Sequence, residues 1–377
     1  CNEKMNGLKS LTYISIGDIV GTGITAVFWF YLASVMNPEE YGEIHYFLGI
    51  AAISSVIVLF GTQNTITVYV AKNIKIQSTF FIISLLGSLI GFFVLVLIFF
   101  RVDTGFLLFA YVINDLSIGY ILGKKVFGLY TKYILIQKTL TLTLGISFYF
   151  LFGVEGIIFA LAISYVVFIF EIYKGFKESK INLELLRPRL GFITNNYVMM
   201  TTGTFGSQID KIIIAPILGF ALLGSYSLAL QVITVMMMFS TIIFKYLLPN
   251  DATGVQNRNI RIIAILVAIL VTFLGMILSP IIIPELFPKY SEAVEAIQIM
   301  SLGVVPGTIN ILLISKFLGQ EKSKFVLISS LISLITITSG TITLGIMFET
   351  KGIATAYVLS LLSSSIFLIC TNKFSKS

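Results

Sequence analysis

The sequence predicts an all-α polytopic membrane protein with about twelve transmembrane helices. Of its 377 residues, 57% are hydrophobic and only 11% are charged, so the chain has too little polar surface to face water. Its mean hydropathy is +0.98. Apolar runs of about 20 residues, long enough to cross the hydrocarbon core, recur along the whole chain between short charged breaks.

The predicted spans fall into two sets, and each span is an apolar run that ends at charged or turn-forming residues. The first six are expected at residues 11–35, 44–70, 78–100, 104–123, 130–151 and 154–174. The second six are expected at residues 190–218, 222–248, 260–283, 293–316, 324–347 and 352–371. Because each set has an even number of spans, both sets should enter the membrane from the same side.

A polar and basic connection separates the two sets of spans. It runs from Lys174 to Arg189 and is the longest internal connection in the chain. We therefore expect an N-terminal six-helix lobe at residues 1–174, a cytoplasmic linker at residues 175–189 and a C-terminal six-helix lobe at residues 190–377.

The two lobes show a suggestive internal repeat. Residues 113–164 align without a gap with residues 309–360, so that Asn114 corresponds to Asn310. A parallel repeat of this kind relates the lobes by an axis along the membrane normal. Two similar helical bundles that face one another across a central cavity are typical of transporters.

The distribution of basic residues predicts the orientation. Of the 25 lysines and arginines, 21 are assigned to one side of the predicted membrane, in connections or in the parts of spans that lead to them. The exceptions are Arg101, Lys289 and Lys351 on the other side and Lys211 within a span. The positive-inside rule therefore predicts that both termini are cytoplasmic. The net charge of +7 then lies beside anionic headgroups, so membrane lipids are expected partners and a nucleic acid is not.

Polar side chains inside spans are candidate functional residues, because a charge at the centre of a span costs about 2.5–3.5 kcal/mol on insertion scales. In the N-terminal lobe Asp18 is either a structural ion-pair partner near the cytoplasmic interface or a proton or cation site. Gln63 and Asn64 either line a cavity or bond neighbouring helices. Asn114 and Asp115 lie near the midplane, where a carboxylate needs a cavity, a partner or a proton.

The span at residues 190–218 is the richest in polar groups. Gln208 and Lys211 lie on one helical stripe, and Asp210 lies on the adjoining one. Lys211 either attracts a phosphate as a point charge or neutralises a nearby aspartate. Asn310, the repeat mate of Asn114, either faces a cavity or holds its lobe together.

Two further features of the spans carry predictions. Pro306-Gly307 should kink its span, and we expect a hinge there. His45, the only histidine, follows the first external break and is predicted to be an interfacial residue.

No catalytic pattern is present in the sequence. It has a single histidine, no paired carboxylates at ligand spacing and no glycine-rich phosphate loop. We therefore predict a protein that is not an enzyme and has no catalytic residues, no metal site and no cofactor. A coupling ion, H⁺ or Na⁺, is compatible with the acidic residues.

Several segments resemble polysaccharide flippases of the O-antigen type, a family in the superfamily that also contains multidrug-and-toxin exporters. The resemblance rests on Asn37-Pro38-Glu39-Glu40-Tyr41-Gly42, on Gln208-Ile209-Asp210-Lys211 before the turn at Gly219, and on the helix end from Asn310 to Gly319. It extends over nearly the whole chain.

The resemblance implies two six-helix lobes around a central cavity, a fold like that of the multidrug-and-toxin exporters. It implies a flippase that moves an isoprenoid-phosphate-linked oligosaccharide from the cytoplasmic to the external leaflet of the plasma (inner) membrane by alternating access, for surface polysaccharide synthesis. Glycosyltransferases of the same pathway would be partners. The chain departs from the family in having Lys211 alone at depth instead of several arginines, which leaves room for a neutral or singly charged headgroup.

Two other functions remain open at this point. A cation-coupled multidrug exporter of the same fold would use Asp18, Asp115 and Asp210 as its working groups. A membrane-embedded glycan polymerase or ligase is the second alternative, but such enzymes usually need a long external loop, and the predicted external connections are short.

Overall fold

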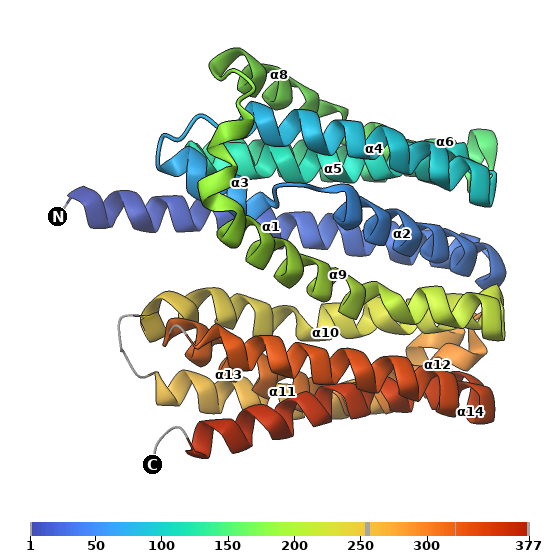
Figure 1. Cartoon of the computed structure of the whole chain (residues 1–377). Coiled ribbons are helices and arrows are strands. Elements are labelled where there is room, and N and C mark those ends of the chain that lie inside the picture. The colour runs from blue at the N-terminus through green and yellow to red at the C-terminus, as the bar shows by residue number, and fades with distance from the viewer. Residues whose placement is uncertain (1, 253–256, 321, 375–377) are drawn as a thin grey trace. The chain divides into compact units, whose positions relative to one another are not determined.

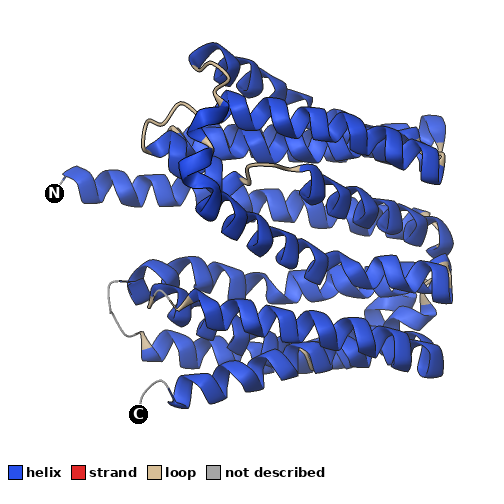
Figure 2. Ribbon diagram, in the orientation of Figure 1, coloured by secondary structure: helices blue, strands red, loops and turns tan. Residues whose placement is uncertain are grey.

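The computed structural model describes residues 2–252, 257–320 and 322–374, and almost all of them are helical (Figures 1 and 2). No strand occurs within these described residues. A helix satisfies its own backbone hydrogen bonds, as a segment surrounded by hydrocarbon must. The prediction of an all-α polytopic membrane protein is confirmed.

Within the described part of the chain, nine helices are long and apolar enough to cross a membrane, and one bent pair would make a tenth. The prediction of about twelve is higher for two reasons. α14 (Ser323–Phe374) counts once, although the non-helical φ and ψ of Glu349 divide its 52 residues into two helices. α9 (Leu190–Leu218) is long enough to span but does not count, because its many polar residues lower its hydropathy.

The chain divides into two compact units. Unit 1 comprises Cys1–Trp29 and Phe47–Thr204, and unit 2 comprises Phe30–Tyr46 and Phe205–Ser377. The boundaries of these units fall at other residues than the boundaries predicted for the two lobes. Three helices therefore belong to unit 1 at one end and to unit 2 at the other, namely α1 (Asn2–Val35), α2 (Pro38–Val58) and α9.

Unit 1 is organised around α5, which packs against its neighbours α3 and α4. Gly119 of α5 permits the close approach of α3, because a Cβ atom there would lie 2.8 Å from the Gln63 carbonyl oxygen. Besides its parts of α1, α2 and α9, the unit contains α3 (Gln63–Ala71), α4 (Gln77–Phe99), α5 (Val102–Gly123), α6 (Phe127–Phe152), α7 (Val154–Ser164), the 3₁₀ helix η1 (Tyr165–Phe168), α8 (Ile169–Glu178), η2 (Leu183–Leu185) and η3 (Arg187–Arg189).

The predicted span at residues 44–70 is broken between α2 and α3. α2 ends at Val58, and Gly61, in the break that follows, has φ of +103°, a left-handed conformation that favours glycine. The Ser84 hydroxyl donates to the Phe60 carbonyl at 2.8 Å, which satisfies a backbone group that the break leaves without a helical partner. The Thr62 hydroxyl accepts from the Thr65 N–H at 3.3 Å and so caps the new helix. The expectation of one continuous span was wrong.

Unit 2 contains α10 (Phe220–Ala252), α11 (Arg258–Leu286), α12 (Ser291–Ser301), α13 (Val304–Gly319) and α14. α10, α11, α13 and α14 run side by side (Figure 1). The unit also includes the last part of α1 and the first part of α2, and α2 packs on α10 at backbone distance. A Cβ atom at Gly42 would lie 1.9 Å from the Phe220 carbonyl oxygen, so only glycine fits.

The bend predicted at Pro306-Gly307 lies slightly earlier in the chain. α12 and α13 meet at 47° at the short break between Ser301 and Val304. Pro306 then falls in the first turn of α13, where a missing N–H costs no helical hydrogen bond. The hinge role of Pro306-Gly307 stays a prediction.

Candidate functional site

In unit 1, Asp18 links α1 to α6. The Tyr130 hydroxyl donates to Asp18 Oδ1 at 2.9 Å, and the carboxylate is half-buried. Neighbouring Gly17 lies against α6, since a Cβ atom there would approach Thr131 to 3.2 Å. Asp18 therefore has a structural partner in the Tyr130 hydroxyl.

Asn114 and Asp115 are half-buried on α5. The Asn114 side-chain amide donates to Asp115 Oδ1 at 3.4 Å, which is long for a hydrogen bond to a carboxylate. Asp115 also interacts electrostatically with Tyr165 of η1. The carboxylate therefore lies beside the 3₁₀ stretch that interrupts the helix α7–α8.

Gln63 and Asn64 form the first turn of α3. Gln63 is half-buried and Asn64 is exposed. The Gln63 carbonyl accepts from the Thr67 hydroxyl at 2.8 Å, within the same helix. These two residues occupy the start of a helix, and not the interior of one continuous span at residues 44–70 as predicted.

Unit 2 contains a buried polar cluster on α9. The Asp210 carboxylate accepts from the Tyr226 hydroxyl at 2.7 Å and from the Lys211 N–H at 2.8 Å, and the residue is 6% exposed. The Lys211 ammonium donates to Gln208 Oε1 at 2.8 Å. We refer to Gln208, Asp210, Lys211, Tyr226 and His45 as the α9 cluster.

His45 joins this cluster from α2. It is 4% exposed, its ring lies 4.6 Å from that of Tyr41, and it interacts electrostatically with Lys211. The structure shows that His45 is buried within unit 2, to which the first part of α2 belongs, and its position at the membrane interface stays a prediction. The structure thus adds His45 and Tyr226 to the three residues of α9 that the sequence singled out.

Asn310 holds two helices of unit 2 together. Its amide donates to the Leu361 carbonyl of α14 at 3.0 Å, and the residue is buried. Nearby, the Ser240 and Thr308 hydroxyls share a hydrogen bond of 2.8 Å that joins α10 to α13. These contacts favour the structural interpretation of Asn310.

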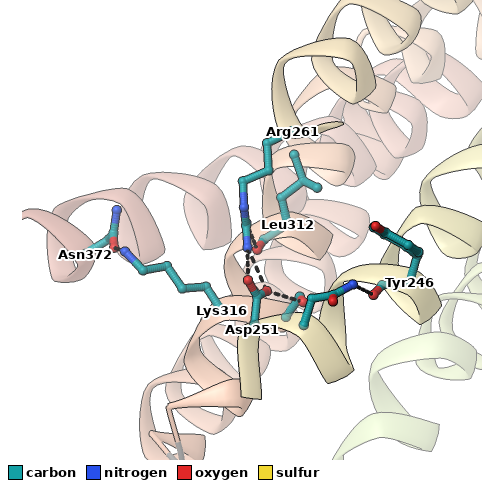
Figure 3. Close-up of polar contacts among 8 residues, drawn as sticks. Tyr246, Asp251, Arg261, Leu312, Lys316 and Asn372 are labelled. Atoms are coloured by element: carbon teal, nitrogen blue, oxygen red, sulfur yellow. Dashed lines mark hydrogen bonds and ion pairs between the residues drawn. The ribbon is translucent and has the colours of Figure 1, made fainter. Parts of the chain in front are cut away.

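A largely buried ion pair that the sequence analysis did not single out connects α10, α11 and α13 (Figure 3). Arg261 Nη2 donates to both oxygens of Asp251, at 2.5 and 2.6 Å, and its Nη1 donates to the Leu312 carbonyl at 2.7 Å. The Ser315 hydroxyl completes the arrangement with a 2.6 Å bond to Asp251. We call these four residues the Asp251 clamp.

Comparisons with known proteins identify the fold. No family model matches the sequence, and no curated protein matches it. An inward-facing multidrug resistance MATE family transporter of the MOP superfamily aligns with a TM-score of 0.72 at 15% identity, covering 97% of this chain and 98% of that one. The lipid II flippase MurJ in an inward closed conformation aligns with a TM-score of 0.75 at 14% identity, over 96% and 87%.

A MOP superfamily transporter from Pyrococcus furiosus is also similar, with a TM-score of 0.65 at 15% identity over 98% of this chain and 95% of that one. Identities this low show the fold alone. The chain therefore has the fold of MOP superfamily transporters and is a multi-pass membrane protein.

Proposed function

We propose that the chain is a flippase that moves an isoprenoid-phosphate-linked oligosaccharide from the cytoplasmic to the external leaflet by alternating access. It would act in the plasma membrane, with both termini in the cytoplasm, and would receive its substrate from glycosyltransferases. The polarity of α9 is the observation that carries this proposal.

α9 is long enough to cross the membrane but too polar to face lipid along its length. A Cβ atom at Gly203 or at Gly206 would have no neighbouring atom within 4 Å, so part of the helix has open space beside it. Polar backbone and side chains at membrane depth are tolerated where they line a water-filled cavity or lie buried in protein. We infer that α9 lines a wet passage through which the hydroxyls of a glycan stay hydrated.

The α9 cluster gives this passage a group that suits a phosphate. Lys211 lies within the predicted span at residues 190–218, and Gln208 orients its ammonium. An ammonium attracts phosphate as a point charge. A single cation suits a monophosphate or a weakly bound headgroup. A tightly bound diphosphate would need several arginines.

The test is a flipping assay in proteoliposomes. A fluorescent isoprenoid-phosphate oligosaccharide is placed in one leaflet, and its transfer is followed by an impermeant glycosidase. Lys211→Gln should slow flipping about ten- to hundred-fold, since a charge-assisted hydrogen bond is worth about 1.5–3 kcal/mol. Lys245→Gln, about two turns before the end of α10, is the control and should flip at the rate of the unaltered chain.

A cation-coupled exporter of the same fold is the second candidate, and the weakly bonded carboxylate of Asp115 favours it. If the chain is such an exporter, the unaltered chain should export a cationic dye and flip no glycolipid. Asp115→Asn should then abolish the efflux of the dye. If the unaltered chain flips the glycolipid and does not move the dye, the exporter is excluded.

A further inference from the structure

The segment that joins α8 to α9 in unit 1 exposes apolar side chains beside basic ones. It comprises residues 173–187, and we call it the strap. Tyr173, Ile181 and Leu183 are 58%, 55% and 62% exposed. Asn182 has an extended backbone, with φ of −145° and ψ of 102°, so the side chains of Ile181 and Leu183 on either side of it point the same way. The strap therefore has one apolar face.

Hydrogen bonds to α4 determine where this face points. The Ser78 hydroxyl donates to the Ser179 carbonyl at 2.9 Å. The Asn182 N–H donates to the Thr79 hydroxyl at 2.9 Å. The Ser179 hydroxyl accepts from the Ser78 N–H at 3.2 Å, which is one of the N–H groups that have no partner within α4. Because these bonds hold the strap backbone against the first turn of α4, the apolar face is turned outward.

Two helices place the strap at the level of the lipid headgroups. The span that leads into it is Val154–Glu178, whose 25 residues cover about 37 Å, and the hydrocarbon core is about 30 Å thick. α4, to whose first turn the strap is bonded, has 23 residues and covers about 34 Å. Both helices are longer than the core, so their ends, and the strap with them, lie in the headgroup layer. At this level apolar side chains contact the upper part of the acyl chains.

The carboxylates beside the lysines of the strap are largely neutralised. Glu171 of α8 pairs with Lys174 at 2.6 Å. Glu178 pairs with Lys124, which follows α5. Glu184 is the remaining carboxylate of the strap, and it is exposed.

The other cations of the strap outnumber this carboxylate. Lys177, Lys180 and Arg187 are exposed, and within the described part of the chain no carboxylate forms an ion pair with them. The Lys177 ammonium lies 4.4 Å from the centre of the Tyr173 ring. Aromatic and basic side chains are typical of the ends of membrane spans. Anionic headgroups complement these cations, whereas zwitterionic headgroups carry no net charge.

We propose that the strap binds anionic phospholipids, with Ile181 and Leu183 at the top of the acyl chains and with Lys180 and Arg187 on the phosphates. Each lysine or arginine near an anionic surface strengthens binding about five-fold. The proposal concerns the lipids around the chain and goes beyond the proposed function, because it does not depend on what the chain transports. A strap that faces bulk water is the alternative.

The test places a fluorophore on the strap of the full chain. A bimane group is attached to Leu183→Cys in a chain that also carries Cys1→Ser and Cys370→Ser. The vesicles are phosphatidylcholine with a small fixed fraction of phosphatidylglycerol, and one of the two lipids carries bromine atoms, which quench bimane on contact, near the top of its acyl chains. Quenching normalised to mole fraction should be at least about ten-fold stronger for brominated phosphatidylglycerol than for brominated phosphatidylcholine.

Two double variants provide the matched comparison. Lys180→Gln with Arg187→Gln should lower the preference for phosphatidylglycerol at least about five-fold, because it removes two cations from the strap. Lys324→Gln with Lys373→Gln removes the same charge from exposed positions of unit 2 and should leave the preference unchanged. All four positions are exposed, so both variants should fold, and a single symmetric peak in size-exclusion chromatography checks this.

Equal quenching by the two brominated lipids would overturn the proposal. A preference that survives the loss of Lys180 and Arg187, or that falls as much in the unit 2 control, would overturn it as well. Absence of quenching by either lipid would place the strap in water, with the same consequence. None of these measurements involves transport, so a negative result leaves the proposed function untouched.

Discussion

Asp210 is kept inside unit 2 by two hydrogen bonds, one from the Tyr226 hydroxyl and one from a backbone N–H. A carboxylate this deeply buried is costly unless its oxygens are bonded. Gln208 and Lys211 bond one another beside it, so the α9 cluster is held in a defined arrangement before any ligand binds.

Replacing Tyr226 removes one of these bonds without changing the size of the side chain. Tyr226→Phe should lower the free energy of unfolding in mixed micelles by about 1.5–3 kcal/mol, because a buried carboxylate loses a donor. Tyr246→Phe, at a residue that is 49% exposed, is the control and should change it by less than about 0.5 kcal/mol. Equal stabilities of the two variants would argue against a buried Asp210.

Contacts within unit 2 explain why these residue types occur in the segment Asn37-Pro38-Glu39-Glu40-Tyr41-Gly42. Asn37 and Glu40 bond one another's backbone N–H groups at 3.1 and 2.9 Å and so cap α2. Tyr41 is fully buried against Tyr290, with ring centroids 5.9 Å apart. Gly42 then meets α10 at backbone distance.

A methyl group at this contact would force two helices apart. Gly42→Ala should destabilise unit 2 by about 1–3 kcal/mol, measured as a lower midpoint of thermal unfolding, because the facing atom is backbone and cannot move away. Gly128→Ala, where a Cβ atom has no neighbour within 4 Å, should be neutral or slightly stabilising. A loss of stability at Gly128 as large as that at Gly42 would contradict the close contact.

Single residues differ in how far the sequence predicts them. The three polar residues of α9 stand out because hydrocarbon penalises them wherever the helix packs. The burial of His45 could not be predicted, because it arises from contacts of α2 with segments far away in the chain. Asp251 follows a predicted span, so the sequence alone suggests a solvated residue. In the structure its carboxylate is bonded by Arg261 and Ser315.

Among the helices, hydropathy predicts where apolar runs lie better than where they break. The break at Gly61 depends on a left-handed φ and on the Ser84 hydroxyl, and neither lowers the hydropathy of the run. The 3₁₀ stretch η1 is likewise held by a tertiary contact, since the Ser117 hydroxyl donates to the Phe168 carbonyl at 3.0 Å. Such mid-helix stretches often mark hinges.

The Asp251 clamp ties the ends of three helices of unit 2. Arg261→Gln should lower the free energy of unfolding by about 3–5 kcal/mol, because it leaves the Asp251 carboxylate buried without its cation. Lys351→Gln removes an ion pair with Glu295 in which both side chains are more than half exposed, and it should cost at most about 1 kcal/mol.

The double variant Asp251→Asn with Arg261→Gln completes this test. It should recover part of the lost stability, because no buried charge is left unpaired. If Arg261→Gln alone costs no more than Lys351→Gln, the clamp contributes little to the unit.

At the scale of the whole molecule, composition and length were sufficient to predict the fold class. The membrane excludes every arrangement except helices and closed barrels, and the length of the apolar runs selects helices. The Asp251 clamp was beyond such reasoning, because it joins residues from three helices whose packing no hydropathy pattern specifies. The substrate stays a proposal for the same reason.

The central claim is that α9 borders water at the depth of the bilayer core. Gly203 lies about 20 Å along the helix from each of its ends, and Ile90 is a lipid-facing residue, 67% exposed, in the middle part of α4. The most direct test is the rate at which Gly203→Cys and Ile90→Cys, each in a chain carrying Cys1→Ser and Cys370→Ser, react with a membrane-impermeant thiol reagent in vesicles. Because only a hydrated thiol ionises, we predict that Gly203→Cys reacts at least about ten-fold faster and is protected by the lipid-linked oligosaccharide. Equally slow reaction of both variants would contradict a wet passage along α9 and, with it, the account of this protein as a flippase.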